Sequence, residues 1–211
     1  MGIPRNNRLF RCAAPAEPEQ ETDLRLLRIG WHADAAGLWV PKSALPCSGI
    51  HCRAENADGA QLGELLCRQC GRLGADTVVL ESPDDACVAA AARVLHGCGI
   101  RCCSPTGAEG ALRIVRDTDP RPASSYACRI TARCTLTELS PGGIRREVTR
   151  SELEQLVRES GASLCRSEEL SAVYATLHMG NAVFFALFDT EDTLRERAVR
   201  RLEEGAVVCF L

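Results

Sequence analysis

Glu81 is the residue of this sequence best suited to acid–base chemistry. It ends the short apolar segment DTVVLE (76–81) and comes directly before Ser82-Pro83, where the next predicted helix begins. Acids that follow strands often cap the next helix, but Glu81 stands before the predicted cap, so a site role fits it better. A carboxyl group buried at the end of a strand has a raised pKa and can act as a general acid or base.

Other carboxylates also follow predicted strands. These acids are Asp34, Glu55, Glu168 and Glu169. Parallel strands of an α/β domain direct their C-terminal ends to one rim, and that rim is where sites form. We therefore expect one of the last three acids to supply a second catalytic carboxylate beside Glu81. Asp34 and Trp31, which share the first of these strands, are expected to contact a ligand.

Thirteen cysteines are an unusually high number for a chain of 211 residues. Cys47, Cys52, Cys67 and Cys70 could together form a four-thiolate zinc site, which remains an alternative. Cys67 and Cys70 fall inside a predicted helix, however, and many other cysteines lie in apolar segments where cysteine behaves as a small buried hydrophobe. The sequence therefore favours reduced core thiols and no metal.

The remaining residues give no support for a cofactor. The four histidines are isolated from one another, and no G-x-G-x-x-G or Walker pattern follows a predicted strand. We expect no cofactor.

Composition narrows the classes of partner and location. The formal net charge of −3 gives no attraction to nucleic acid, and no apolar segment reaches the length of a membrane span. The N-terminus has no hydrophobic region of a signal peptide, so we expect a cytoplasmic protein. Lys42 is the only lysine among the 25 basic residues, which is typical of a GC-rich bacterial genome.

Apolar segments alternate with capped amphipathic segments along the chain. Strands are predicted at 24–34, 48–55, 76–81, 99–104, 111–117, 126–139, 162–169 and 206–211, with a hairpin over 173–189. Helices are predicted to begin at Asp58, Ser82, Thr149 and Asp189 and to end at glycines.

This order indicates an α/β fold with parallel strands. A closed (β/α) barrel usually takes about 250 residues, so we predict a reduced or incomplete (β/α) barrel, with an open doubly wound α/β sheet as the alternative. Residues 1–22 are predicted to be a flexible arm, and residues 23–211 a single α/β domain.

The segment from residue 161 to the C-terminus resembles the end of chitinase-like glycoside hydrolases of family 18, including the spore-germination hydrolases of that family. Tyr174, the strand AVFFALFD and the helix from Asp189 match the family in order and spacing. Upstream, GADTVVLE falls where the family carries D-G-x-D-x-D-x-E. The resemblance implies a barrel, places Glu81 on the family's general acid and makes Tyr174 a ligand-binding candidate.

The departures from the family pattern concern its chemistry. Thr77 and Val79 replace the two inner aspartates, and Phe210-Leu211 stand where the family places a sugar-stacking tryptophan. The resemblance implies that the second aspartate orients the acetamido group of the substrate, which valine cannot do. We therefore favour a non-catalytic, degenerate glycosidase-like barrel that binds a glycan or small ligand. The alternatives are a divergent glycoside hydrolase with Glu81 as general acid and a zinc-stabilised interaction module.

Overall fold

The computed structural model describes residues 8–17 and 24–211. Its contacts divide the chain into two compact units. The first unit comprises the described residues up to Arg129 and those from Arg201 on, and the second comprises Ile130–Arg200. None of the helices in these residues is long and apolar enough to span a membrane. That residues 23–211 act as one domain stays a prediction.

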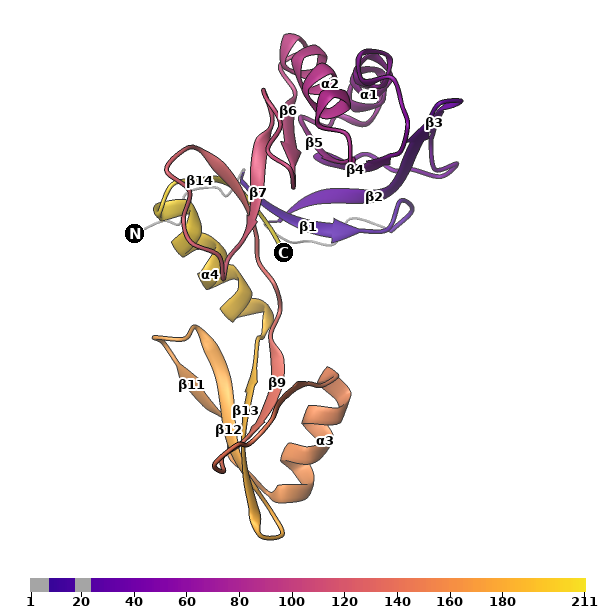
Figure 1. Ribbon diagram of the computed structural model, residues 1–211. Helices are drawn as coiled ribbons and strands as arrows, with labels where there is room; N and C mark the ends of the chain where they lie inside the picture. Colours follow the sequence, from indigo (N-terminus) through magenta and orange to yellow (C-terminus); the bar gives the residue numbers. More distant parts are fainter. Residues whose placement is uncertain (1–7, 18–23) are drawn as a thin grey trace, which may run out of the picture. The chain divides into compact units, whose positions relative to one another are not determined.

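The first unit is a closed barrel of parallel strands (Figure 1). In order around the barrel, its eight described strands are β1 (Leu9–Ala13), β2 (Arg25–Asp34), β4 (Gly49–Ala54), β5 (Thr77–Glu81), β6 (Arg101–Ser104), β7 (Leu112–Arg116), β8 (Tyr126–Arg129) and β14 (Ala206–Phe210). The barrel is closed because β1 pairs with both β14 and β2. The short β3 (Gly37–Trp39) pairs antiparallel with β2. The predicted reduced (β/α) barrel is confirmed, and the open sheet is wrong.

The strand β1 corrects the predicted N-terminal arm. Residues 9–13 lie inside the segment 1–22 that composition predicts to be flexible, yet Leu9 and Phe10 are buried in the barrel. One of the two strands that pair with β1 is β14, at the other end of the sequence, so local composition gives no sign of this pairing. Residues 1–7 and 18–22 of the predicted arm lie outside the described residues.

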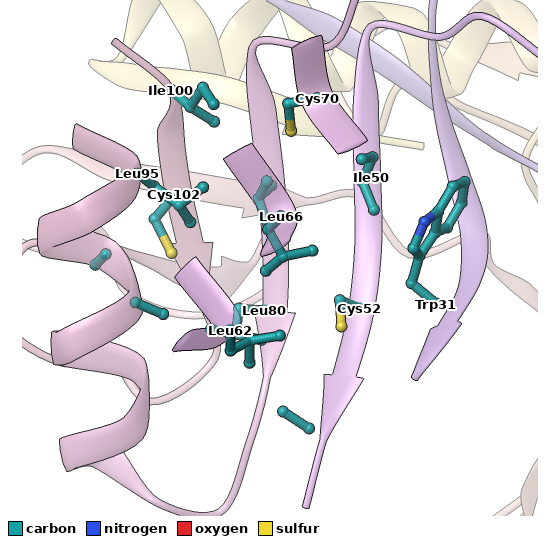
Figure 2. Packing of buried hydrophobic residues seen from close by; sticks show 14 of the residues in the cluster. Trp31, Ile50, Cys52, Leu62, Leu66, Cys70, Leu80, Leu95, Ile100 and Cys102 are labelled. Carbon is teal, nitrogen blue, oxygen red and sulfur yellow. The ribbon is translucent and has the colours of Figure 1, made fainter. Parts of the chain in front are cut away.

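Side chains alternate between the two faces of each strand, so the barrel unit has two apolar cores. Side chains on one face fill the barrel interior: Phe10, Leu27, Val79, Cys103, Ala127, Val208 and Phe210. Side chains on the other face, such as Val78 and Leu80 of β5, pack under α1 (Gly59–Leu73) and α2 (Asp85–Gly97). Figure 2 shows Cys52, Cys70 and Cys102 among the apolar side chains of this outer core. The face that a strand residue occupies therefore decides whether it lies inside the barrel or under the helices.

The two helices of the barrel unit begin with aspartates. Asp58 caps α1 and Gly74 ends it with a φ of 75°, both as predicted. The cap of α2 is Asp84, whose side chain accepts a hydrogen bond from the Ala86 N–H, and not the predicted Ser82. Asp84 itself has an extended backbone, with φ −100° and ψ 105°, so the helix begins later than the Ser82-Pro83 pair suggests.

The second unit is an antiparallel sheet covered on one face by a helix. Its strand order is β10 (Arg145–Glu147), β9 (Cys134–Glu138), β13 (Ala182–Phe188), β12 (Ala172–Met179) and β11 (Cys165–Ser167). The helix α3 (Arg150–Ser160) lies along this sheet in Figure 1. It is capped by Thr149, as predicted, and packs through Leu153 on Leu136, Leu177 and Phe188.

Two predictions for this region need correction and one is confirmed. The predicted strand 126–139 is two strands, β8 and β9, which belong to different sheets. The predicted strand 162–169 contains only the short β11, which pairs antiparallel with β12 and is not a barrel strand. The predicted hairpin over 173–189 is confirmed by the pairing of β12 with β13.

Asp189 also has a different role from the predicted helix cap. Its carboxylate is fully buried and pairs with Arg133 at 2.8 Å and with Arg197. The reciprocal hydrogen bonds of Thr190 and Thr193 begin α4 (Glu191–Glu203) instead. Asp189 thus stabilises the second unit by compensating buried guanidinium charge.

Close packing of α1 on α2 requires small residues at the contact. A Cβ atom on Gly63 would lie 2.8 Å from the Val94 Cβ and 3.0 Å from the Ala91 carbonyl oxygen. Gly71, on the exposed side of the same helix, has no atom within 4 Å of that position. The two glycines therefore differ in their surroundings while sharing a helical backbone.

This difference predicts opposite effects of alanine. Gly63→Ala is expected to lower the free energy of unfolding by about 1–3 kcal/mol, because overpacking forces the helices apart. Gly71→Ala, the control, is expected to raise it by about 0.5–1 kcal/mol through helix propensity alone. Chemical denaturation of both variants measures this. Equal effects of the two substitutions would contradict the described helix contact.

Candidate functional site

Glu81 lies at the mouth of the barrel, where the strands end. It is the last residue of β5 and is two positions beyond Val79, which fills the barrel interior. Since side chains alternate along a strand, Glu81 points to the interior side. Its side chain is 26% exposed.

Three basic side chains surround the Glu81 carboxylate. His51 Nε2 lies 3.2 Å and Arg129 Nη2 3.1 Å from its Oε1 atom, and Arg53 Nε lies 3.4 Å from its Oε2 atom. His51 and Arg53 come from β4, which neighbours β5, whereas Arg129 ends β8, which is separated from β5 by β6 and β7. The contact with Arg129 therefore reaches across the mouth.

These neighbours decide the protonation state of Glu81. Burial acts to raise the pKa of its carboxyl group, but the positive charges of His51 and Arg129 and their hydrogen bonds outweigh burial, so the pKa is lowered. A general acid needs the opposite shift, as burial alone would give. Glu81 is therefore a carboxylate at neutral pH.

An open pocket of about 490 Å³ lies beside Glu81. It is lined by Arg53, Ala54, Glu55, Glu81, Ser82, Pro83 and Pro105. The sequence predicted that Glu55 and Glu81 share one rim, and both line this pocket. The pocket also brings Arg53 to the same place, which sequence reasoning did not single out.

A cysteine stands near this cluster on β1. Burial raises the pKa of Cys12, although the positive charges of Arg129 and Arg11 act in the other direction. The negative charge of Glu81 raises it further. The thiol is therefore protonated at neutral pH and is poorly suited to nucleophilic attack.

The predicted ligand contact of Trp31 is wrong. Its side chain is 2% exposed and belongs to the outer core with Cys52 and Ile50 (Figure 2). The register of β2 against β4 shifts between Arg28 and Trp31, which moves Trp31 from the interior face to the outer one. Asp34 ends β2, and its Oδ1 atom accepts a hydrogen bond from the Ala36 N–H in the turn to β3.

The remaining predicted residues belong to the second unit. Glu168 and Glu169 follow β11, so the assumption that they end a parallel barrel strand is wrong. Tyr174 lies on β12 and stacks on Phe185, with ring centroids 5.6 Å apart. None of these three residues lies on a barrel strand. A catalytic role for the two acids and a ligand contact for Tyr174 stay predictions.

The alternative zinc site does not assemble. Among the described residues, no group of three or more His, Cys, Asp or Glu side chains is placed to hold a metal ion. Burial raises the pKa of Cys52, Cys67 and Cys70 to about 12, as is typical of thiols in apolar surroundings. Cys52 and Cys70 serve the outer core instead.

No protein-family model matches the chain, and no curated protein matches it either. Several solved structures, however, match the chain. The spore cortex-lytic enzyme SleL of Bacillus megaterium QM B1551 superposes with a TM-score of 0.56 and 8% sequence identity over 96% of this chain and 70% of that one. A chitinase from Chromobacterium violaceum ATCC 12472 superposes with a TM-score of 0.52 and 8% sequence identity over 97% of this chain and 93% of that one. The fold is that of a chitinase-like barrel.

The SleL enzyme of Bacillus cereus gives a similar result, with a TM-score of 0.53 and 9% identity over 97% of this chain and 70% of that one. The predicted resemblance to family 18 barrels is thus confirmed as a structural resemblance. At such low identity the likeness concerns the fold. The chemistry of this chain has to be argued from its own residues.

The sequence analysis did not identify three residues that surround Glu81, namely His51, Arg53 and Arg129. The first two carry a readable signal, because they alternate with the buried Ile50 and Cys52 along β4. Arg129 gives no such signal, since its contact with Glu81 depends on closure of the barrel.

The ion pairs of Glu81 predict a pH-dependent effect on stability. Glu81→Gln is expected to lower the free energy of unfolding by about 1–2 kcal/mol at pH 7, because three basic groups lose their shared counter-charge. The folded-state pKa of Glu81 is lowered, so this stabilisation is present above its unfolded value of about 4.3 and is lost as the pH falls through the folded value.

Denaturant unfolding of the wild type and Glu81→Gln from pH 7 to pH 3 measures this contribution. Glu64→Gln, at an exposed position of α1, controls for the loss of one negative charge. A difference that stays constant over the whole pH range would contradict an ionised, paired Glu81.

Proposed function

We propose that this protein binds a glycan or another small ligand at the mouth of its barrel and does not hydrolyse it. The observation that carries the proposal is the contact of Glu81 with Arg53, Arg129 and His51. These contacts stabilise the carboxylate, whereas donation of a proton to a leaving group requires the protonated acid. The open pocket beside Glu81 gives a ligand access to the same place.

Two substitutions at the mouth support a binding role over catalysis. Val79 stands two residues before Glu81, fills the barrel interior and has no group that could orient an acetamido substituent. Phe210, near the end of the last strand, is 3% exposed and packs against Phe10, so it offers no stacking surface to a sugar. The mouth thus has an acid, Glu81, at the position of the family's general acid, but lacks the aspartate and the tryptophan that the family resemblance implies beside it.

The proposal also draws on what the similar structures are called. The two SleL proteins are spore cortex-lytic enzymes, and the third is a chitinase. A saccharide is therefore the first class of ligand to test. A cytoplasmic location stays part of the proposal.

A second candidate is a divergent glycoside hydrolase. Glu55 and Glu81 line one pocket, and a pair of carboxylates flanking a glycosidic bond is the usual requirement for hydrolysis. In this case a bound substrate would have to displace the arginines and restore a proton to Glu81. The ion pairs make this the weaker candidate.

Hydrolysis and binding assays with chitotetraose and soluble peptidoglycan fragments separate the two candidates. The wild type and Glu81→Gln are both expected to leave the saccharides intact, while calorimetry detects binding by the wild type. Glu64→Gln serves as the control.

Turnover by the wild type that falls at least 100-fold in Glu81→Gln, with Glu64→Gln unchanged, would overturn the non-catalytic role and favour the hydrolase. Absence of both binding and turnover would remove the saccharide.

A further inference from the structure

The interior face at the mouth carries three arginines. Arg53 and Glu81 are register partners on β4 and β5, and Arg116 and Arg129 are register partners on β7 and β8. Residues in register on neighbouring parallel strands point to the same face. Three arginines therefore share the interior face at the mouth with Glu81.

Each of these arginines is placed on the interior side by an independent observation. Arg53 and Arg129 both contact Glu81, from opposite sides of its carboxylate. Arg116 stands two residues after Ile114, which packs against the interior core. Alternation along β7 therefore directs Arg116 to the same face as Ile114.

The grouping of arginines is local to the mouth. The chain as a whole has a formal net charge of −3, so composition alone would not gather arginines here. Glu55, the second acid of the pocket, follows the end of β4 and is exposed. Asp34 ends β2 on the same face, and its Oδ1 atom accepts a hydrogen bond from the Ala36 N–H.

The arginines are also accessible to a ligand. The side chains of Arg53 and Arg129 are 72% and 47% exposed. A guanidinium group presents five N–H donors in a planar fork that matches the oxygens of a carboxylate or phosphate. The contacts with Glu81 are made by Arg53 Nε and Arg129 Nη2.

We infer that the ligand of the barrel mouth is anionic and that Arg53, Arg116 and Arg129 bind its carboxylate or phosphate group. This inference rests on the proposed function, since it specifies the ligand of the same site. Glu81 holds Arg53 and Arg129 in place by its two oxygen atoms, so it positions the arginines without neutralising all three.

Calorimetry with matched charged and neutral saccharides tests the inference. Trigalacturonate is compared with its fully methyl-esterified form, and glucose 6-phosphate with glucose. The charged member of at least one pair is expected to bind at least tenfold more tightly, and which pair responds identifies carboxylate or phosphate. Added salt is expected to weaken only the charged member.

Variants locate the binding to the mouth. Arg116→Gln and Arg53→Gln are each expected to weaken binding of the charged saccharide about tenfold and to leave the neutral one unchanged. Arg68→Gln removes the same charge from an exposed position on α1 and is expected to have no effect. Thermal unfolding checks that each variant is folded, and Arg116→Gln leaves the contacts of Glu81 intact.

Three outcomes separate the inference from the proposed function. Equal affinity for the charged and neutral members, or tighter binding of neutral chitotetraose, overturns the anionic ligand and leaves saccharide binding standing. An equal effect of Arg68→Gln and Arg116→Gln overturns the assignment to the mouth. No binding of any of these saccharides overturns both.

Discussion

Pairing of β1 with both β14 and β2 is the constraint on which the site depends. It closes the sheet, so that the last residues of strands far apart in the sequence meet around one opening. The contact between Glu81 at the end of β5 and Arg129 at the end of β8 exists only because of this closure. In an open sheet with the same strand order, β6 and β7 would separate the two side chains.

Closure also explains why the mouth differs chemically from a general-acid site. An acid at the end of an interior strand would have a raised pKa if its neighbours were apolar. Here the neighbours include His51 and Arg129, whose charges and hydrogen bonds outweigh the effect of burial and lower the pKa of Glu81. The same group of side chains that stabilises Glu81 as a carboxylate places the exposed guanidinium groups of Arg53 and Arg129 at the mouth. The proposed non-catalytic role and the inferred anionic ligand therefore rest on the same group of side chains.

Local sequence patterns were sufficient to predict many strands and helices of the barrel, but not which strands pair with one another. The apolar segment before Glu81 and the caps at Asp58 and Gly74 predict β5 and α1 correctly, because those signals are local. The strand β1 was missed, since its stability comes from nonlocal pairing. Trp31 was assigned to the wrong face because a bulge, which a pattern of alternation cannot show, shifts the register of β2. Glu168 was assigned to the rim because a short strand does not reveal whether it pairs parallel or antiparallel.

The central claim is that Glu81 is held as a carboxylate by its basic neighbours. Titration of ¹³C-labelled glutamate side chains by NMR, with the Glu81 signal assigned from Glu81→Gln, measures this directly. The claim predicts a pKa for Glu81 below the ordinary value of about 4.3. A pKa of about 6 or above would show a carboxyl group poised to donate a proton, and would contradict it.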